Sequence, residues 1–303
     1  HFGLVTTGLG LYWTPLVWNG PAKVMAAYLG YGPDCEIVRM LLSTLILGPI
    51  ESLLSLPLGA YGQLVLEERF GFNNQTAGGW LLDALKSMVV EMLISAVSMA
   101  PLVWTLRSLG PHAWLYGWLF LSVFVIVFNM AYPILIMPLF NKFSPMETGP
   151  VRDSIERLVA KTKLSSYTIL VSDGSRQSSH SNAFVTGFFG VKRIVIYDTL
   201  LTDLGNSVPD VTAVLAHEVG HAKLGHNYIS LVLVLLNLFM TFFTYGYMQS
   251  EGRSLAAQFG YALPADPSSE EQGVPGSVFL TLNLFFMVFS AIVSPPFELM
   301  MNV

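Results

Sequence analysis

Long apolar runs alternate with short polar connections along most of the chain. A helix needs about 20 mostly apolar residues to cross a bilayer. Six segments approach this length, and we expect each to form a membrane-spanning helix: residues 1–22, 37–64, 81–106, 113–140, 227–250 and 273–297. Most of these segments carry no Lys, Arg, Asp or Glu, which is rare in the buried core of a soluble protein. The pattern therefore predicts a polytopic membrane protein that is mainly α-helical.

The second and third segments are less regular than the others. Pro49 and Pro57 are expected to break the second segment, which also holds Glu51, while the third holds Glu91. A charge inside a membrane is costly and should face the bundle interior or a hydrated cavity. The two glutamates therefore form a buried hydrogen-bonded pair or line a hydrated cavity. Three other charged side chains lie near segment ends and can extend to the membrane surface: Arg39, Asp83 and Lys86.

Between Asn141 and Asp210 the pattern becomes that of a soluble α+β region. The stretch VRDSIERLVAKTKL has the spacing of an amphipathic helix, with Ile155, Leu158 and Val159 on one side. The stretches YTILVSD, NAFVTGFF and KRIVIYD are rich in β-branched and aromatic residues and predict short strands.

These patterns divide the chain into three parts. We expect four spans in residues 1–140, a soluble region in residues 141–226, and two further spans with their connecting loop in residues 227–303. The first residue is His1 rather than Met, so we expect that the natural N-terminus lies upstream.

Composition agrees with a membrane protein and narrows the function. Of 303 residues, 53% are hydrophobic and 12% are charged, about half the usual charged fraction of soluble domains. A net charge of −5 gives no indication of nucleic-acid binding. Cys35 is the only cysteine, which excludes an internal disulfide.

The candidate chemistry lies in the sequence His217-Glu218-Val219-Gly220-His221, an H-E-x-x-H motif on an expected helix. Residues four apart share one helix face, so both imidazoles can bind one zinc ion. Zinc lowers the pKa of a bound water towards ~7, and Glu218 would take the water's proton as it attacks a carbonyl. Two unrelated histidines on a helix near the membrane are the alternative interpretation.

The other ligands are harder to locate. His226 lies nine residues after His217, half a turn away, so we expect it to point elsewhere as a helix-end residue or as a group that supports a ligand. The third zinc ligand must come from a distant segment, most simply a carboxylate on a later helix.

An edge strand upstream of the motif is the candidate substrate site. Asn182 and Ala183 lie on this expected strand, and zinc peptidases commonly hold an extended peptide against such an edge. Asn182 can also bond the substrate main chain. His180 is either an additional ligand or a loop residue with a structural hydrogen bond.

Several blocks of the sequence together resemble the type I CAAX prenyl proteases, which are integral-membrane zinc metallopeptidases. The blocks occur in the family's order, and their joint occurrence is far more specific than H-E-x-x-H alone. They are EERFGFNNQT from Glu67, PLFNKFSPME from Pro138, DGSRQSSHSNAFVTGFFGVKRIVIYDTLL from Asp173 and AHEVGHAKLGH from Ala216.

The resemblance implies a barrel of seven transmembrane helices around a large hydrated chamber, with six of the helices visible in this sequence. It also implies one Zn2+ per chain on His217 and His221, with Glu218 as general base. The family's third ligand is a glutamate just after the last span, expected beyond Val303; Glu298 is only a weak candidate. Asn182, Ala183 and His180 would bind the substrate.

The resemblance further implies removal of the C-terminal tripeptide from prenylated CAAX proteins or peptides, with a second upstream cleavage in some members. The expected partners are these lipidated peptides and membrane lipid, and the expected location is the endoplasmic reticulum membrane, with the inner nuclear membrane as a second site. Two alternatives stay open: a membrane quality-control metalloprotease of the bacterial heat-shock type, and a non-catalytic chamber that binds lipidated peptides. A transporter would show two repeated halves, which the sequence lacks.

Overall fold

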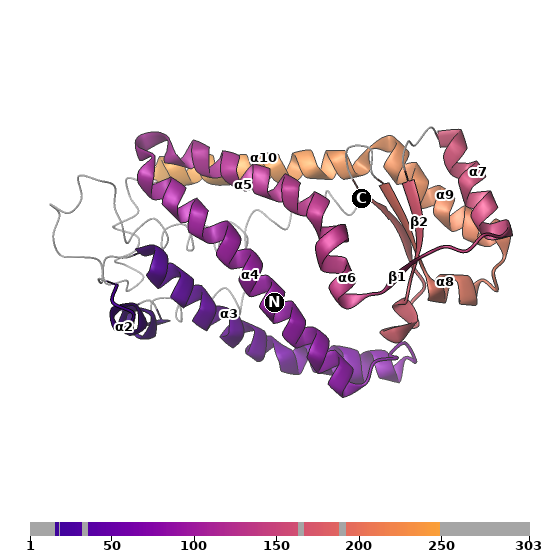
Figure 1. Ribbon diagram of the computed structural model, residues 1–303, viewed down its shortest axis with the longest axis horizontal. Coiled ribbons are helices and arrows are strands. Elements are labelled where there is room, and N and C mark those ends of the chain that lie inside the picture. The colour runs from indigo at the N-terminus through magenta and orange to yellow at the C-terminus, as the bar shows by residue number, and fades with distance from the viewer. Residues whose placement is uncertain (1–15, 18, 32–35, 163–166, 188–191, 249–303) are drawn as a thin grey trace. The chain divides into compact units, whose positions relative to one another are not determined.

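A computed structural model of the chain describes residues 16–17, 19–31, 36–162, 167–187 and 192–248 (Figure 1). Long helices make up most of these residues, and a small sheet accounts for the strands. This architecture confirms the expected fold class of a mainly helical membrane protein with an α+β part. The expected span 273–297 lies outside the described residues, and most of the span 1–22 does as well.

The elements follow one another in the order expected for helices interrupted by one α+β region. The helices are α2 (Pro21–Tyr28), α3 (Glu36–Tyr61), the π-helical turn η1 (Gly62–Glu67), α4 (Ala77–Ser108), η2 (Gly110–His112), α5 (Ala113–Ala131), the π-helical turn η3 (Tyr132–Ile136), α6 (Met137–Phe140), α7 (Pro150–Thr162), η4 (Gly174–Arg176), α8 (Asp198–Asp203), α9 (Val208–Leu224) and α10 (His226–Met248). The strands are β1 (Phe143–Pro145), β2 (Tyr167–Ser172), β3 (Ala183–Thr186) and β4 (Lys192–Tyr197).

Four helical segments of the described chain are long and apolar enough to cross a membrane. They are Leu41–Glu67, Ala77–Leu106, Ala113–Phe140 and His226–Gly246. Each corresponds to one of the six segments expected from the hydrophobic pattern, so four of those six are confirmed as helices of membrane-spanning length.

The expected break at Pro49 and Pro57 is wrong, because α3 continues through both prolines as one helix. Likewise, α4 contains Pro101 in its interior. A proline removes one backbone hydrogen bond, but the remaining backbone groups of an apolar segment still need partners within the helix. The proline signal that ends helices in water is therefore weaker in such segments.

Glu51 and Glu91 are both exposed on their helices. Among the described residues, this exposure argues against the buried hydrogen-bonded pair that was one of the two interpretations of these glutamates. The interpretation as cavity-lining residues stays a prediction.

The described residues fall into two compact units. One consists of the described residues within His1–Leu54, Lys86–Phe124 and Val232–Val303, and the other of those within Ser55–Leu85 and Val125–Leu231. In the first unit, α4, α5 and α10 pack around buried Leu102 and Phe242. The indole N–H of Trp118 donates to the Leu235 carbonyl at 3.2 Å, which adds a polar contact between α5 and α10.

The second unit contains a four-stranded sheet in the order β1-β2-β4-β3. Strands β2 and β4 run parallel, with Ile169 opposite Ile194, while β1 and β3 are antiparallel to their neighbours. The two short strands therefore form the edges of the sheet.

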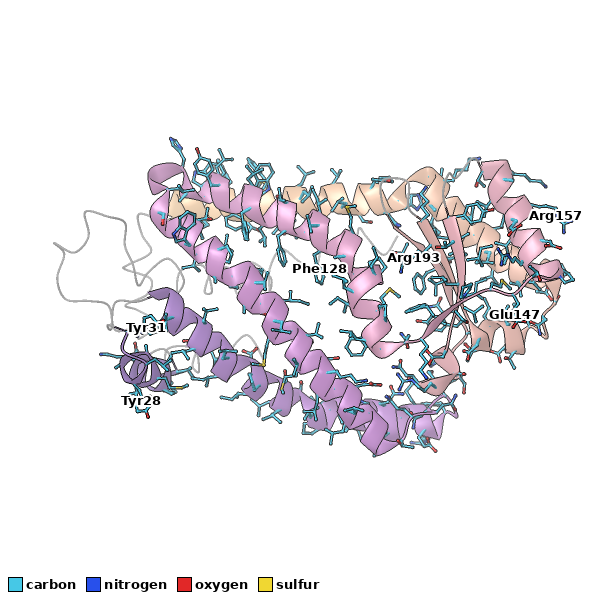
Figure 2. All side chains as sticks on the ribbon, in the orientation of Figure 1. Tyr28, Tyr31, Phe128, Glu147, Arg157 and Arg193 are labelled. Atoms are coloured by element: carbon cyan, nitrogen blue, oxygen red, sulfur yellow. The ribbon has the colours of Figure 1, made fainter. Side chains whose placement is uncertain are left out.

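Helices α7 and α9 contribute to the core of the second unit together with the sheet (Figure 1). On α7 the buried residues Val151, Ile155 and Val159 recur every four positions, which confirms the amphipathic helix expected there. Arg157 lies on the outer side of α7 (Figure 2). In the same unit, Arg193 of β4 donates to the Pro133 carbonyl of η3 at 2.7 Å.

Candidate metal centre and substrate strand

The two histidines of the motif lie on the exposed side of α9. The buried side of this helix carries Val211, Leu215 and Val219. His217 and His221 each follow a buried residue by two positions, which is about 200° around a helix. Packing against the sheet therefore turns both imidazoles outward, and both are exposed.

The ring nitrogens of this pair converge. Nε2 of His221 lies 3.0 Å from Nε2 of His217. Imidazole nitrogens bind zinc at about 2.0–2.1 Å, so one ion can reach two nitrogens at this separation. The pair thus fits a zinc site, although the described residues contain no group of three or more His, Cys, Asp or Glu that could hold a metal. Glu298, the weak candidate for a third ligand, lies outside the described residues.

His226 contacts the opposite nitrogen of His221. Gly225 ends α9 with φ +74°, a conformation that glycine adopts without steric cost, and α10 begins directly at His226. This tight turn brings Nδ1 of His226 to 2.6 Å from Nδ1 of His221. When Nδ1–H of His221 donates to His226, the Nε2 lone pair of His221 is available to a metal.

The end of α9 also favours a cation electrostatically. His221 lies in the last turn of the helix, where the unsatisfied carbonyls carry partial negative charge. Glu218 follows His217 by one position, about 100° around the helix, and its side chain is half-buried. Its carboxylate therefore lies to one side of the histidine pair.

Strand β3 is an edge strand, as expected from the sequence. Its register pairs Ala183 with Ile196 and Val185 with Ile194, and the N–H of Tyr197 donates to the Asn182 carbonyl at 3.0 Å. Because residues of an antiparallel strand bond alternately to either side, the backbone groups of Ala183 and Val185 point to the outer edge. In the described chain, no strand pairs with that edge.

Strand β3 and helix α9 are neighbours in one core. Ala183 of β3 is buried in the same cluster as Val219, which lies inside the H-E-x-x-H motif. An extended peptide paired with β3 would therefore run close to α9. Asn182 lies at the start of this edge, and its side chain is exposed.

His180 has partners of its own. Its Nε2 lies 2.9 Å from Oε2 of Glu67, and its ring stacks on Phe72 with centroids 4.1 Å apart. The contact with Glu67 is the structural hydrogen bond that was one of the two interpretations of His180. Among the residues that the structure describes, it belongs to no metal-binding group.

The contacts of Glu67 and Phe72 with His180 were not predicted from the sequence. In the same region, Asp83 accepts hydrogen bonds from Gln75 at 2.7 Å and Gln177 at 3.3 Å; its expected position at the membrane surface stays a prediction. The polar run EERFGFNNQ directly follows an apolar helix, and this pattern could have indicated polar contacts with another segment.

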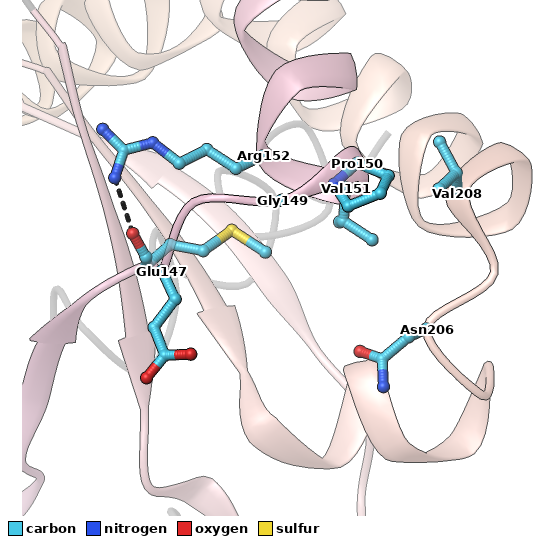
Figure 3. Close-up of a pocket in the computed structure, with 8 residues that line it drawn as sticks. Glu147, Gly149, Pro150, Val151, Arg152, Asn206 and Val208 are labelled. Atoms are coloured by element: carbon cyan, nitrogen blue, oxygen red, sulfur yellow. Dashed lines mark hydrogen bonds between the residues drawn. The ribbon is translucent and has the colours of Figure 1, made fainter.

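A separate pocket lies near the N-terminal ends of α7 and α9 (Figure 3). Arg152 donates to the Met146 carbonyl at 2.6 Å beside it, and Asn206 and Val208 line the other side. Its volume of about 290 Å3 is just below the range of about 300–1,000 Å3 for ligand pockets. Val208 precedes His217 by nine residues of α9, a rise of about 13.5 Å along the helix. The pocket is therefore separate from the histidine pair.

Two family models together match nearly the whole chain. Residues 2–142 match the CAAX prenyl protease N-terminal model, described as five membrane helices, and residues 145–297 match peptidase family M48.

Individual relatives agree with these models. CAAX prenyl protease 1 homolog of Arabidopsis thaliana is 35% identical over 82% of this chain and 58% of its own length. CAAX prenyl protease 1 of Saccharomyces cerevisiae is 33% identical over 93% of this chain and 62% of its own length. The crystal structure of S. mikatae Ste24p superimposes with a TM-score of 0.80 at 31% identity, covering 92% of this chain and 64% of that one.

The chain thus spans about 58–64% of the length of these relatives. Its membrane helices, its M48 region and its similarity to a solved structure all point to one family. The chain therefore belongs to peptidase family M48 and, within it, to the CAAX prenyl protease family.

Proposed function

We propose that this chain is the major part of a zinc metalloendopeptidase that removes the C-terminal tripeptide from prenylated CAAX proteins or peptides. The observation that carries the proposal is the convergence of Nε2 of His217 and Nε2 of His221, 3.0 Å apart, on a helix that shares a core with an edge strand. Metal-binding groups beside a peptide-binding edge are the two parts that a zinc peptidase needs.

Each residue has a defined part in this proposal. His217 and His221 would hold one zinc ion, and the third ligand would come from outside the described residues. Bound there, the ion would supply Lewis-acid polarisation of the scissile carbonyl and of a water nucleophile. Glu218 accepts the water proton on a carboxylate oxygen and passes it to the leaving amine nitrogen. The outward backbone groups of Ala183 and Val185 align the peptide, and the Asn182 side chain bonds its main chain.

The substrate class is supported by family membership rather than by the site geometry. The relatives named above are CAAX prenyl proteases, and residues 2–142 match the N-terminal membrane region of that family. This match favours a protease for prenylated substrates over a quality-control protease of the heat-shock type. We extend the proposal to the endoplasmic reticulum membrane: the helices of membrane-spanning length support a multi-pass membrane protein, and the choice of this membrane rests on the resemblance to the CAAX prenyl proteases.

The test is cleavage of a farnesylated CAAX peptide by the purified full-length protein in lipid vesicles. We expect release of the tripeptide by mass spectrometry, loss of cleavage with a zinc chelator, and recovery on adding zinc. The same peptide without the farnesyl group is the matched control and should be cleaved much more slowly. Chelator-insensitive cleavage, or none by zinc-loaded protein, would refute the proposal.

A further inference from the structure

The segment that leads into the substrate strand has little regular structure of its own. Residues 173–182 contain only the short turn η4 before β3 begins at Ala183. Such a segment needs external contacts to hold one position. In the described chain, many of those contacts come from Glu67–Asp83, about a hundred residues upstream.

Backbone pairing forms the first set of contacts. Asn73 and Ser178 form an antiparallel bridge. The Asn74 N–H donates to the Gln177 carbonyl at 3.2 Å, and the Ser179 N–H donates to the Phe72 carbonyl at 2.9 Å. The tip of the upstream loop thus acts as a short strand laid along this segment.

Side chains add a second set along the same line. The Asn74 amide donates to the Ser175 carbonyl and to the Ser179 hydroxyl, each at 3.0 Å. Arg176 donates to the Phe140 carbonyl at 2.5 Å and forms an ion pair with Asp83 at 3.4 Å. The hydrogen-bonded partners of Asn74 are about a hundred positions away, so these bonds join parts of the chain that are distant in sequence.

The contacts end at His180, two residues before Asn182. The His180 ring is held on one side by Phe72 and at Nε2 by Glu67, while its carbonyl accepts a bond from the Thr199 hydroxyl at 3.0 Å. Asn182 then enters the ladder with β4. The position of β3 at the metal-binding helix is therefore tied to the loop through His180.

We propose that Glu67 and Phe72 are positioning residues that act through His180 to place the substrate strand against α9. They touch neither the histidine pair nor the proposed peptide edge, so their effect is on substrate alignment. This inference rests on the proposed function, because it assigns a role in binding the same peptide.

The chain offers a matched pair of variants. Phe70 and Phe72 lie in the same loop, but Phe70 is 70% exposed and Phe72 is stacked on His180. We expect Phe72→Ala to raise KM for the farnesylated CAAX peptide by about 10-fold or more, since misplacement of a substrate lowers its productive binding. Phe70→Ala should leave KM unchanged, and both variants should retain the zinc content of the wild type.

A double-mutant cycle tests whether the effect passes through the stack. His180→Ala should reproduce the change in KM, and adding it to Phe72→Ala should have little further effect, because both remove the same contact. Phe72→Tyr keeps the aromatic ring, and Glu67→Gln keeps a hydrogen-bonding group. Both variants should therefore keep KM at the wild-type value. The His180 side chain is 55% exposed, so its truncation should not prevent folding.

Binding can be measured without turnover, which separates this inference from the proposed function. In a Glu218→Gln background, fluorescence anisotropy of a labelled farnesylated peptide should show weaker binding for Phe72→Ala than for Phe70→Ala. An equal affinity of the two variants would overturn the inference. A Phe72→Ala variant that loses zinc and has a lower kcat at unchanged KM would also overturn it. Absence of cleavage by the wild type would overturn the proposed function only.

Discussion

The Nδ1 atom of His221 lies 2.6 Å from the Nδ1 atom of His226, across the turn that joins α9 to α10. Nε2 of His221, on the other side of the same ring, faces His217. A histidine that binds metal through one nitrogen usually donates its other N–H to a neighbour, which fixes the tautomer and the ring orientation. His226 occupies the place of that neighbour.

Replacing His226 should therefore weaken metal binding without removing a ligand. We expect His226→Ala to lower zinc affinity by about 10- to 100-fold, since partners of ligating histidines have effects of this size. Competition with a chromogenic chelator measures the affinity. Lys223→Ala, at an exposed position in the last turn of α9, is the control and should bind zinc normally. An unchanged affinity in His226→Ala would show that the contact is incidental.

Glu218→Gln should separate metal binding from catalysis. Glutamine keeps the size of the side chain but cannot take a proton, so kcat should fall by about 10²- to 10⁴-fold while zinc content stays the same. His217→Ala should instead abolish both zinc binding and turnover. Metal analysis and peptide cleavage on the same preparations distinguish these outcomes. A Glu218→Gln variant with wild-type kcat would remove the general-base role.

A proline on the outer edge of β3 should weaken substrate binding. The Val185 N–H points away from β4, so Val185→Pro keeps the ladder inside the sheet but removes one donor from the edge. A hydrogen bond contributes about 0.5–1.5 kcal/mol, which corresponds to a rise in KM of about 2- to 10-fold. Val185→Ala is the control for lost packing, because it retains the N–H. Equal KM values for the two variants would argue against pairing at this edge.

The helix packing of the first unit makes a prediction about stability. A Cβ added at Gly117 in α5 would lie 2.8 Å from Cδ2 of Leu106 and 2.9 Å from Cε1 of Phe242. We expect Gly117→Val to destabilise the protein by about 1–3 kcal/mol through overpacking, seen as a lower Tm in detergent. Gly78→Val, where a Cβ meets no atom within 4 Å, should change Tm much less.

The helix-scale features of this protein were predictable from the sequence because they depend on local spacing. The amphipathic pattern of α7 appears directly as buried Ile155 and Val159. The spacing of His217 and His221 places them one turn apart in any helix, before any tertiary contact forms. The breaks expected at Pro49 and Pro57 do not occur, because the effect of a proline on a helix depends on the surroundings of that helix.

Only the tertiary structure decided which distant groups meet. Sequence spacing placed His226 half a turn from His217, but the left-handed turn at Gly225 starts a new helix and returns its ring to His221. Similarly, no local pattern relates Glu67 to His180, because their contact forms only when segments 113 positions apart are brought together. Local periodicity determines which faces of a helix or strand exist; long-range packing determines what each face contacts.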